Sequence, residues 1–401
     1  MTQAKLMHEP KARTRIAIIG ASISGSATAL ALSRHKNLEI EVFERRKRSE
    51  VADKPCGNIC TNEINKYIRK LGLKGDFKLS EYREIEVFSP SKTAAFPTKE
   101  YEIDRKKLLD GMIGVAEMNG VKFNFSHEFV SMEEGMCDTA LQFKFGKNNV
   151  YDNVDIVIGA DGSNSKVAEI IGKENEDFYM FLQTTVPAKD VRYKCMQRSF
   201  RQSLRPDKNG YKIFIGEEYG YYAYIFPSKD GKYFKIGLGD DYTHDVMKKF
   251  KSFLINFGLG GIGDCDISGA LIPKPGLEPT MFPPYLIGDA SCNVKYTGGG
   301  IVPDMEQALA LADKIVNKNY FKSFSLKKKS FINSRISWMI ENMFDKDCDR
   351  AVEIFRSPEF KQIFLKRDNP KIIDMIKLIS PRTIWFVAGI LGNIMIGRRK
   401  K

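Results

Sequence analysis

The stretch TRIAIIGASISGSATALALSRHKNLEIEVFE, residues 14–44, decides the fold. Residues 14–19 form a short apolar, β-branched run, and a glycine-containing turn separates them from a helical segment over residues 27–36. Residues 38–44 then alternate apolar and acidic side chains and end at Glu44. Strand, glycine turn, helix, strand and acid in this order are the fingerprint of a dinucleotide-binding βαβ unit.

Each residue of the turn has a physical task. Gly20 permits the tight turn, and Gly25 lets the helix pack closely on the strand, so that free N–H groups at the helix start face a pyrophosphate. Ser22 stands where the fingerprint has its middle glycine; its hydroxyl can donate to phosphate, and we expect Ser24 to contact the cofactor too. Glu44, 19 residues after Gly25, can accept hydrogen bonds from ribose hydroxyls. The early position of the unit favours FAD over NAD(P); a βα turn without a nucleotide is the alternative.

The bulk composition bounds the class of protein. A chain of 401 residues with 43% hydrophobic and 11% aromatic residues can build a large core, in two lobes or in one large α/β domain with insertions. The 63 Lys and Arg exceed the 50 Asp and Glu, for a formal net charge of +13. That excess favours an anionic partner, such as a phosphorylated substrate, an acidic membrane surface or a nucleic acid.

Cysteine and histidine usage indicates the compartment and argues against a metal. The seven cysteines are an odd number, and the first 15 residues are polar and charged, without the pattern of a secretory signal. We therefore expect free thiols in a reducing cytoplasm. None of the four histidines lies at metal-ligand spacing from another, so no metal site is predicted. Basic and aromatic residues do not interleave as in nucleic-acid-binding proteins, so no nucleic-acid partner is predicted.

One segment invites a membrane interpretation. Residues 383–397, TIWFVAGILGNIMIG, are almost all apolar and precede four basic residues at 398–401. Fifteen helical residues span roughly 22 Å, short of the ~30 Å hydrocarbon core of a bilayer, so a spanning helix is not expected. Two alternatives stay open: a helix in the membrane interface at the inner face of the cell membrane, or a helix packed on the protein.

Three later segments carry further nucleotide-binding signals. Asp104-Arg105 opens an amphipathic helix in residues 101–120, and a buried strand in residues 152–172 runs into Gly159-Ala160-Asp161-Gly162. Residues 283–316 carry Gly288-Asp289 and then Gly298-Gly299-Gly300-Ile301 before another helix. A carboxylate at such a strand end can reach ribityl hydroxyls, and backbone N–H groups of the triple glycine can stabilise negative charge on a reduced flavin.

In this order, the motifs resemble the FAD-dependent family that includes aromatic hydroxylases, squalene epoxidases and geranylgeranyl reductases. Two segments are similar to the geranylgeranyl reductase branch. Lys54-Pro55-Cys56-Gly57 matches its Lys-Pro-Cys-Gly loop, and Tyr222, Tyr224, Phe226 and Pro227 match its Tyr-x-Trp-x-Phe-Pro strand, with Tyr224 at the usual tryptophan. The resemblance covers roughly residues 14–330. A row of aromatic residues on one face of a strand can also be ordinary core.

The resemblance implies FAD as cofactor and hydride transfer to isolated C=C bonds of a geranylgeranyl chain, with a proton added to the other carbon. Cys56 and Gly57 are then expected at the flavin, with Cys56 affecting substrate position or proton supply; a packed thiol is the alternative. Substrate-cavity residues would be Tyr222, Tyr224, Phe226 and Pro227. The expected cofactor-binding residues are Gly20, Ser22, Ser24, Gly25, Glu44, Cys56, Gly57, Arg105, Val130, Asp161, Asp289, Gly299, Gly300 and Ile301.

The implied partners are a prenyl lipid, a peripheral membrane surface and an electron donor (ferredoxin, NAD(P)H or a reduced deazaflavin). An archaeal source would favour an ether phospholipid precursor; geranylgeranyl diphosphate, chlorophyll and menaquinone side chains are the other substrates. A flavin monooxygenase of the aromatic-hydroxylase type is the alternative enzyme, and a flavin-bearing nucleic-acid-binding protein is the alternative of another class.

The expected fold class is α/β: a Rossmann-like FAD-binding domain of the aromatic-hydroxylase type, an inserted antiparallel β-sheet substrate domain and a C-terminal helical tail. The FAD-binding domain is predicted over residues 1–80, 100–180 and 280–330, the substrate domain over 81–99 and 181–279, and the helical region over 331–401.

Overall fold

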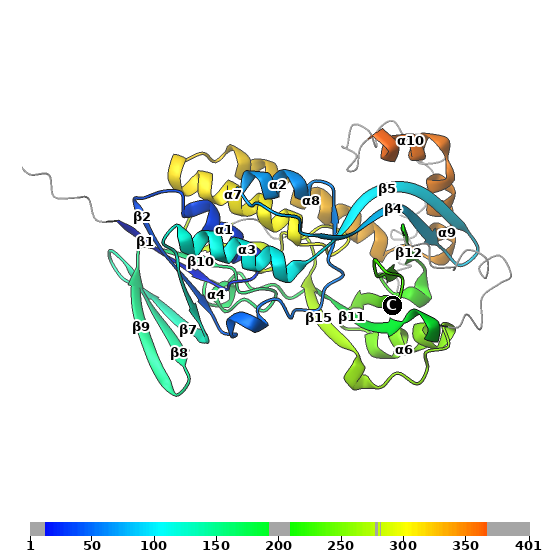
Figure 1. The fold of residues 1–401 in the computed structure, drawn as a ribbon, viewed down its shortest axis with the longest axis horizontal. Coiled ribbons are helices and arrows are strands. Elements are labelled where there is room, and N and C mark those ends of the chain that lie inside the picture. The colour runs from blue at the N-terminus through cyan, green and yellow to red at the C-terminus, as the bar shows by residue number, and fades with distance from the viewer. Residues whose placement is uncertain (1–12, 192–208, 277–279, 281, 367–401) are drawn as a thin grey trace, which may run out of the picture.

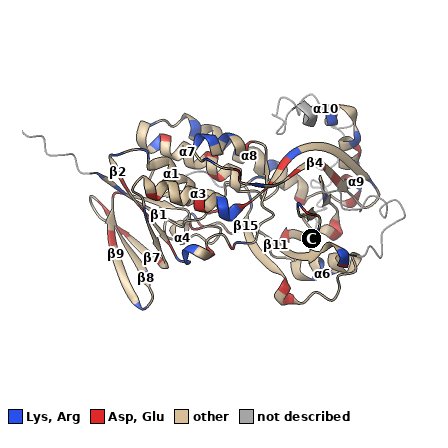
Figure 2. Cartoon of the chain, viewed as in Figure 1, with Lys and Arg blue, Asp and Glu red and all other residues tan. Residues whose placement is uncertain are grey.

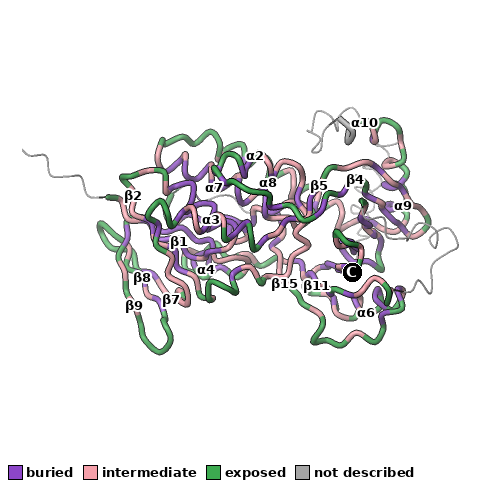
Figure 3. The backbone as a smooth tube through the Cα atoms, viewed as in Figure 1, coloured by how far each residue is buried: buried purple, intermediate pink, exposed green. Residues whose placement is uncertain are grey.

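The computed structural model describes residues 13–366 except 192–208, 277–279 and 281. The molecule is elongated (Figure 1). One end is a lobe of helices and a parallel sheet, and the other is a lobe built on a curved antiparallel sheet. Buried segments run through the interior of both lobes, while exposed segments lie mainly at the periphery (Figure 3). The predicted segment 383–397 lies outside the described residues.

The first lobe contains a parallel sheet of five strands in the order β16-β10-β1-β2-β6. Alternate residues of β1 face opposite ways: Ile16 and Ile18 pack against helices, whereas Ala17 and Ile19 pack toward a three-stranded sheet, β7-β8-β9. The strands are β1 (Thr14–Ile19), β2 (Leu38–Glu44), β6 (Lys122–Phe125), β10 (Ile156–Gly159), β16 (Tyr285–Leu286), β7 (His127–Glu134), β8 (Thr139–Phe145) and β9 (Asn148–Val154). The helices of this lobe are α1 (Ile23–Leu32), α2 (Ile64–Lys70), α3 (Arg105–Met118), α4 (Lys166–Ile170) and α7 (Ile301–Asn317).

Helix α1 begins directly after the glycine turn, four residues earlier than predicted, and all ten of its residues are buried. Its approach to β1 depends on Gly25, because a Cβ there would stand 1.9 Å from the carbonyl oxygen of Gly20. Gly20 has φ +105°, and a Cβ added there would stand 2.3 Å from the carbonyl oxygen of Ala160. The close helix–strand contact predicted from the fingerprint is therefore present.

The second lobe contains an eight-stranded sheet in the order β15-β11-β14-β13-β12-β4-β5-β3, antiparallel except for the β12–β4 pair. Phe250 and Phe253 of α6 (Val246–Asn256) cover one face of this sheet. The strands are β3 (Ile59–Thr61), β4 (Lys78–Phe88), β5 (Thr93–Ile103), β11 (Phe178–Pro187), β12 (Gly210–Phe214), β13 (Tyr222–Pro227), β14 (Tyr233–Asp241) and β15 (Ser268–Pro273). The predicted fold class is confirmed.

One strand differs from the expected division of the chain. Residues 59–61 were predicted in the FAD-binding part, yet as β3 they pair with β5 in the antiparallel sheet. The chain therefore crosses between the lobes in the segment just before β3, which contains the Lys54–Gly57 loop.

Three helices follow the first lobe: α8 (Phe321–Glu341), α9 (Asp345–Arg356) and α10 (Pro358–Lys366). Helix α8 contacts α7 of the first lobe, while Ile340 near its end packs with the aromatic cluster of the second. Val352 of α9 and Phe360 of α10 belong to that same cluster. In the described part of the chain, no helix has both the length and the apolarity needed to cross a membrane.

The Gly25 contact predicts a stability difference between two glycines. Gly25→Ala should lower the free energy of unfolding by about 1–3 kcal/mol, because its methyl group would overpack the turn. Gly114→Ala in α3 is the control: nothing lies within 4 Å of its Cβ position, so helix propensity should make it neutral or stabilising by up to ~1 kcal/mol. Urea unfolding of the apoprotein measures both; equal effects would contradict the packing described for α1.

Candidate active site

A cavity of about 1360 Å³ joins the two lobes. It exceeds the ~300–1,000 Å³ of a typical small-molecule site, so it has room for a dinucleotide and a second molecule. The glycine turn, the Lys54–Gly57 loop, strand β13, the triple-glycine segment and α8–α10 all contribute to its lining. The predicted residues that line it are Gly20, Ser22, Ser24, Glu44, Cys56, Gly57, Arg105, Val130, Asp161, Tyr222, Tyr224, Phe226, Asp289, Gly299, Gly300 and Ile301.

Two predicted site residues do not line the cavity. Gly25 lies behind the turn, where it serves the packing of α1. Pro227 ends β13, and its carbonyl oxygen accepts a hydrogen bond from the hydroxyl of Tyr82 at 2.7 Å. Its place at the end of the strand, outside the cavity, separates it from the three aromatic residues of the same motif.

Glu44 at the end of β2 and Arg105 at the start of α3 both contact the glycine turn, at the polar end of the cavity. Glu44 accepts from the backbone N–H of Ala21 through Oε2 and from that of Arg46 through Oε1, both at 2.9 Å. Arg105 donates to Ser22 Oγ at 2.9 Å and to the carbonyl oxygen of Lys54 at 3.2 Å. Its buried Nε has no hydrogen-bond partner among the described residues. A guanidinium with an unused donor beside a helix start suits a phosphate group.

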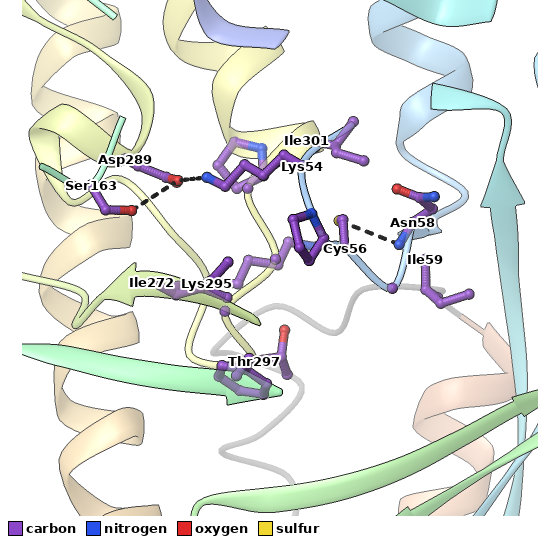
Figure 4. A pocket seen from close by; sticks show the side chains of 18 of the residues that line it. Lys54, Cys56, Asn58, Ile59, Ser163, Ile272, Asp289, Lys295, Thr297 and Ile301 are labelled. Carbon is purple, nitrogen blue, oxygen red and sulfur yellow. Dashed lines mark hydrogen bonds and ion pairs between the residues drawn. The ribbon is translucent and has the colours of Figure 1, made fainter. Parts of the chain in front are cut away.

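Lys54 and Asp289 form an ion pair across this end of the cavity, with Nζ and Oδ2 2.5 Å apart (Figure 4). The Asp289 carboxylate raises the pKa of the Lys54 ammonium, which opposes the effect of burial. Ser163 also donates to Asp289, at 3.4 Å. Lys54 was quoted in the Lys-Pro-Cys-Gly motif but was not predicted as a site residue. Its position five residues before β3 gives no sign of a partner 235 residues away.

Asp304, in the first turn of α7, is a second buried carboxyl group that sequence reasoning missed. Burial, and next the nearby charge of Asp289, raise its pKa well above the ordinary value. Its Oδ1 has no hydrogen-bond partner in the described residues. Nothing in the sequence distinguishes it from a solvated acid at a helix N-terminus, where acids are common.

Asp161 has a local structural contact as well as a place in the cavity lining. Its carboxylate accepts from Ser165 Oγ at 2.5 Å and from the backbone N–H of Val167 at 3.1 Å, at the start of α4. Burial raises the pKa of this carboxyl group. Its side chain is therefore directed into the helix start, and its predicted contact with a cofactor remains a proposal.

The Lys54–Gly57 loop meets the aromatic strand. A Cβ on Gly57 would stand 3.0 Å from the ring of Phe226, and Gly57 O accepts from Lys235 Nζ at 3.3 Å. Asn58 has φ +61°, and this turn lets its backbone N–H donate to Cys56 Sγ at 3.3 Å (Figure 4). Cys60, the other cysteine of the segment, is buried in the first-lobe core, and both cysteines are free thiols.

The aromatic residues of β13 form a wall of the cavity beside this loop. The rings of Tyr224 and Phe226 stack with centroids 4.4 Å apart. Tyr224 donates to Gln183 Oε1 at 3.0 Å, and Tyr222 donates to the carbonyl oxygen of Thr297 at 2.7 Å, just before the triple glycine. Burial raises the pKa of both tyrosine hydroxyls. The neighbouring Cys56 raises the pKa of each to a smaller extent. The three predicted aromatic residues thus share one face.

Helices α8–α10 close the apolar end of the cavity, which the sequence did not predict. Their lining residues are Ile336, Met339, Ile340, Met343, Cys348, Ala351, Ile354, Phe355 and Phe360. These residues were assigned to a helical tail without a role, because their apolar spacing fits ordinary core packing equally well.

A chain of hydrogen bonds runs from the cavity wall toward the surface. Tyr221 lines the cavity, and its hydroxyl lies 3.0 Å from Ser337 Oγ, which in turn lies 2.6 Å from the hydroxyl of Tyr179. Tyr179 donates to Glu341, whose carboxylate pairs with Lys274 at 3.2 Å. Burial raises the pKa of both tyrosine hydroxyls, so both phenols keep their protons at neutral pH.

The polar groups that line the cavity fit FAD. The buried polar atoms that lack partners among the described residues include Arg105 Nε, Asn58 Oδ1 and Asp304 Oδ1, and all three residues line the cavity. These orphaned atoms border the space between the glycine turn and the Cys56 loop. Glu44, Arg105 and Asp289 would hold the nucleotide part, while the backbone N–H groups near Gly299 would face the flavin ring.

Comparisons with known proteins agree with this assignment. The NAD(P)-binding Rossmann-like domain family matches residues 18–86. The geranylgeranyl diphosphate reductase of Oryza sativa subsp. japonica is 22% identical over 263 residues, 60% of this chain and 52% of the relative. That of Synechocystis is 23% identical over 340 residues, 75% of each chain. Kynurenine 3-monooxygenase of Salinispora tropica is 29% identical over 174 residues, 39% of this chain and 38% of the relative. The chain thus spans about half the length of the rice relative.

Solved structures share the fold. A geranylgeranyl bacteriochlorophyll reductase-like protein from Thermoplasma acidophilum superposes with a TM-score of 0.75 at 17% identity, covering 95% of this chain and 99% of that one. The halogenase PltM, solved in complex with FAD, has a TM-score of 0.57 at 14% identity, with 88% and 79% coverage. FAD as the cofactor of this chain remains a prediction, which the fold shared with an FAD-bound halogenase supports.

The ion pair predicts a test of cofactor binding. Asp289→Asn should lower the FAD content of the purified protein at least about tenfold, because it removes the charge that holds Lys54 and would contact the cofactor. Lys106→Ala is the control, since it removes only the exposed Lys106–Asp110 pair on α3. The flavin-to-protein absorbance ratio measures both. Full FAD content in Asp289→Asn would contradict the assignment.

Proposed function

We propose that this chain is an FAD-dependent oxidoreductase similar to geranylgeranyl reductases and that it saturates isolated C=C bonds of geranylgeranyl chains. One observation carries the proposal. The Cys56–Gly57 loop touches the aromatic wall of β13 at Phe226, and both border one cavity that runs from the glycine turn to an apolar end under α8–α10. That shape suits a cofactor at one end and a long apolar chain at the other.

The polar end positions the cofactor. Bound FAD would supply a hydride. Arg105 and the first turn of α1 would bind its phosphate oxygens, and Glu44 would accept hydrogen bonds from its ribose. Lys54 holds the Asp289 carboxylate at this polar end.

The apolar end positions the chain and excludes water. Tyr222, Tyr224 and Phe226 present flat rings against which a prenyl chain can lie. An isolated trisubstituted alkene has no carbonyl group to stabilise charge, so hydride and proton must arrive nearly together in a dry site. Gly57 packs closely on Phe226, since a Cβ there would stand 3.0 Å from the ring, and this keeps the Cys56 loop against the wall.

Three groups can supply the proton: a water molecule, the Cys56 thiol and the hydroxyl of Tyr221. Cys56 Sγ accepts a hydrogen bond from the backbone N–H of Asn58. Among the described residues, no hydrogen bond joins this thiol to a tyrosine. Tyr221 is connected through Ser337 and Tyr179 to Glu341, so a proton lost to the cavity can be replaced from the partly exposed Glu341–Lys274 pair. We favour this route because hydrogen bonds among the described residues link the cavity wall to that partly exposed ion pair. The Tyr221 hydroxyl, which donates to the carbonyl oxygen of Tyr296 in the structure, would turn toward the bound alkene.

The relatives named for geranylgeranyl diphosphate reduction support a prenyl substrate. We propose an archaeal-type ether phospholipid precursor as the first to test, with geranylgeranyl diphosphate, chlorophyll and menaquinone side chains as the others. The net charge of +13 supports an anionic head group. Basic and acidic residues are scattered over both lobes (Figure 2), so this support comes from the whole charge. The electron donor would be ferredoxin, NAD(P)H or a reduced deazaflavin, and the site of action the inner face of the cell membrane.

A flavin monooxygenase is the second candidate, because a kynurenine 3-monooxygenase from Salinispora tropica is 29% identical to this chain over 174 residues. That match covers only 39% of the chain. Oxygen consumption driven by NAD(P)H would favour this candidate over the reductase.

Mass spectrometry tests the proposed reaction. With dithionite as reductant and air excluded, we expect gains of two daltons for each reduced bond in a geranylgeranyl lipid, because each bond takes up a hydride and a proton. The assay should include the ether phospholipid, the diphosphate and a quinone. No gain with any of the three would overturn the reductase proposal.

The same assay tests the loop. Cys56→Ala should keep its FAD content and lower the rate about 10²-fold or more, because the thiol lies where the chain and the cofactor meet. Cys265→Ala is the control, because that cysteine is exposed and outside the cavity. An unchanged rate in Cys56→Ala would show that this thiol is only packed.

A further inference from the structure

Helix α8 exposes an aromatic stripe on its outer side. Phe321, Phe324, Phe331 and Trp338 are 83%, 71%, 59% and 36% exposed. Their spacing of three, seven and seven residues places them on one side of a helix, together with Lys328 and Arg335. We call these six residues the α8 face. Aromatic side chains gathered in the open on one helix usually mark a surface that contacts a partner.

The charge of α8 indicates the kind of partner. Residues 321–341 contain five basic residues and a single acid, Glu341. Lys322 and Lys329 pair with acids of α7, at 2.9 Å to Asp313 and 2.5 Å to Glu306. Arg335, in contrast, lies over the ring of Phe331, 5.0 Å from its centroid. Aromatic rings favour the membrane–water interface, and basic side chains beside them are attracted to anionic lipid head groups.

A second copy of the chain fits this face poorly. Two α8 faces brought together would place Lys328 and Arg335 opposite like charges, which is destabilising. Protein–protein interfaces are also depleted of lysine at their centres, whereas Lys328 lies between Phe324 and Phe331 on this face.

The same helix also borders the cavity. Ile336, Met339 and Ile340 line its apolar end from a side of α8 next to the aromatic stripe, so the stripe lies close to the space proposed for the prenyl chain. A helix with its side chains is ~10 Å thick. A bilayer against the α8 face would therefore lie within one helix diameter of the cavity.

We propose that the α8 face docks on the surface of an anionic bilayer, with its four aromatic rings in the head-group region and Lys328 and Arg335 at the lipid phosphates. This rests on the proposed function for its purpose, since a prenyl lipid substrate resides in such a bilayer. It assigns membrane contact to α8, independently of the apolar segment at residues 383–397.

Flotation of the full-length protein with vesicles tests the proposal. The protein should float with vesicles of phosphatidylcholine and phosphatidylglycerol and at least about tenfold less with phosphatidylcholine alone. Combined Phe321→Ser, Phe324→Ser and Phe331→Ser substitutions should weaken binding to the anionic vesicles about tenfold or more. Tyr151→Ser with Ile255→Ser is the matched control, because both residues are exposed elsewhere and binding should not change.

Fluorescence gives a second readout. The chain has two tryptophans, at 338 and 385. In a Trp385→Phe protein the emission of Trp338 should shift to the blue on adding anionic vesicles, as its ring leaves water. No shift, or full binding by the triple serine variant, would overturn the proposal. A change of molecular mass in that variant with unchanged vesicle binding would point to a second copy and overturn it too.

The outcome is separable from that of the proposed reaction. The triple serine variant should reduce detergent-dispersed substrate at the rate of the unmodified enzyme, because none of its three positions lines the cavity. Vesicle binding that depends on the α8 face, without reduction of any prenyl lipid, would leave the docking surface standing and overturn the reaction.

Discussion

The ion pair between Lys54 and Asp289 joins two segments 235 residues apart and fixes the loop on which the cavity depends. Five residues after Lys54 the chain enters the antiparallel sheet as β3, and Gly57, two residues before this strand, lies against Phe226. The loop is thus held by charge on the nucleotide side and by close packing on the aromatic side. These two contacts make one continuous site from surfaces that belong to different sheets.

This arrangement explains why the chemistry requires both lobes. In the proposed function, the parallel sheet and its helix starts would supply N–H groups and Arg105 for phosphate, as in other dinucleotide-binding units. The antiparallel sheet supplies flat apolar rings, and α8–α10 complete the dry end. Helix α8 both lines the cavity with its inner residues and exposes the aromatic stripe on its outer side.

Local patterns were sufficient to predict much of this site. The strand–turn–helix period and Glu44 identified the βαβ unit, and the alternation of Tyr222, Tyr224 and Phe226 predicted their shared face. What the sequence did not reveal depends on tertiary contacts. Lys54 acquires its role only when Asp289 is brought beside it, and Asp304 only when α7 is buried. Pro227 belongs to the aromatic motif yet lies outside the cavity, because the strand ends there.

The reoxidation of the bound flavin under strict exclusion of oxygen tests the central claim most directly. The enzyme is first reduced with one equivalent of dithionite, and then a geranylgeranyl lipid or its fully saturated counterpart is added. Our account predicts that the visible absorbance of the flavin returns with the unsaturated lipid and stays bleached with the saturated one. Absorbance that returns only when oxygen is admitted, whichever lipid is present, would contradict the account and support a monooxygenase.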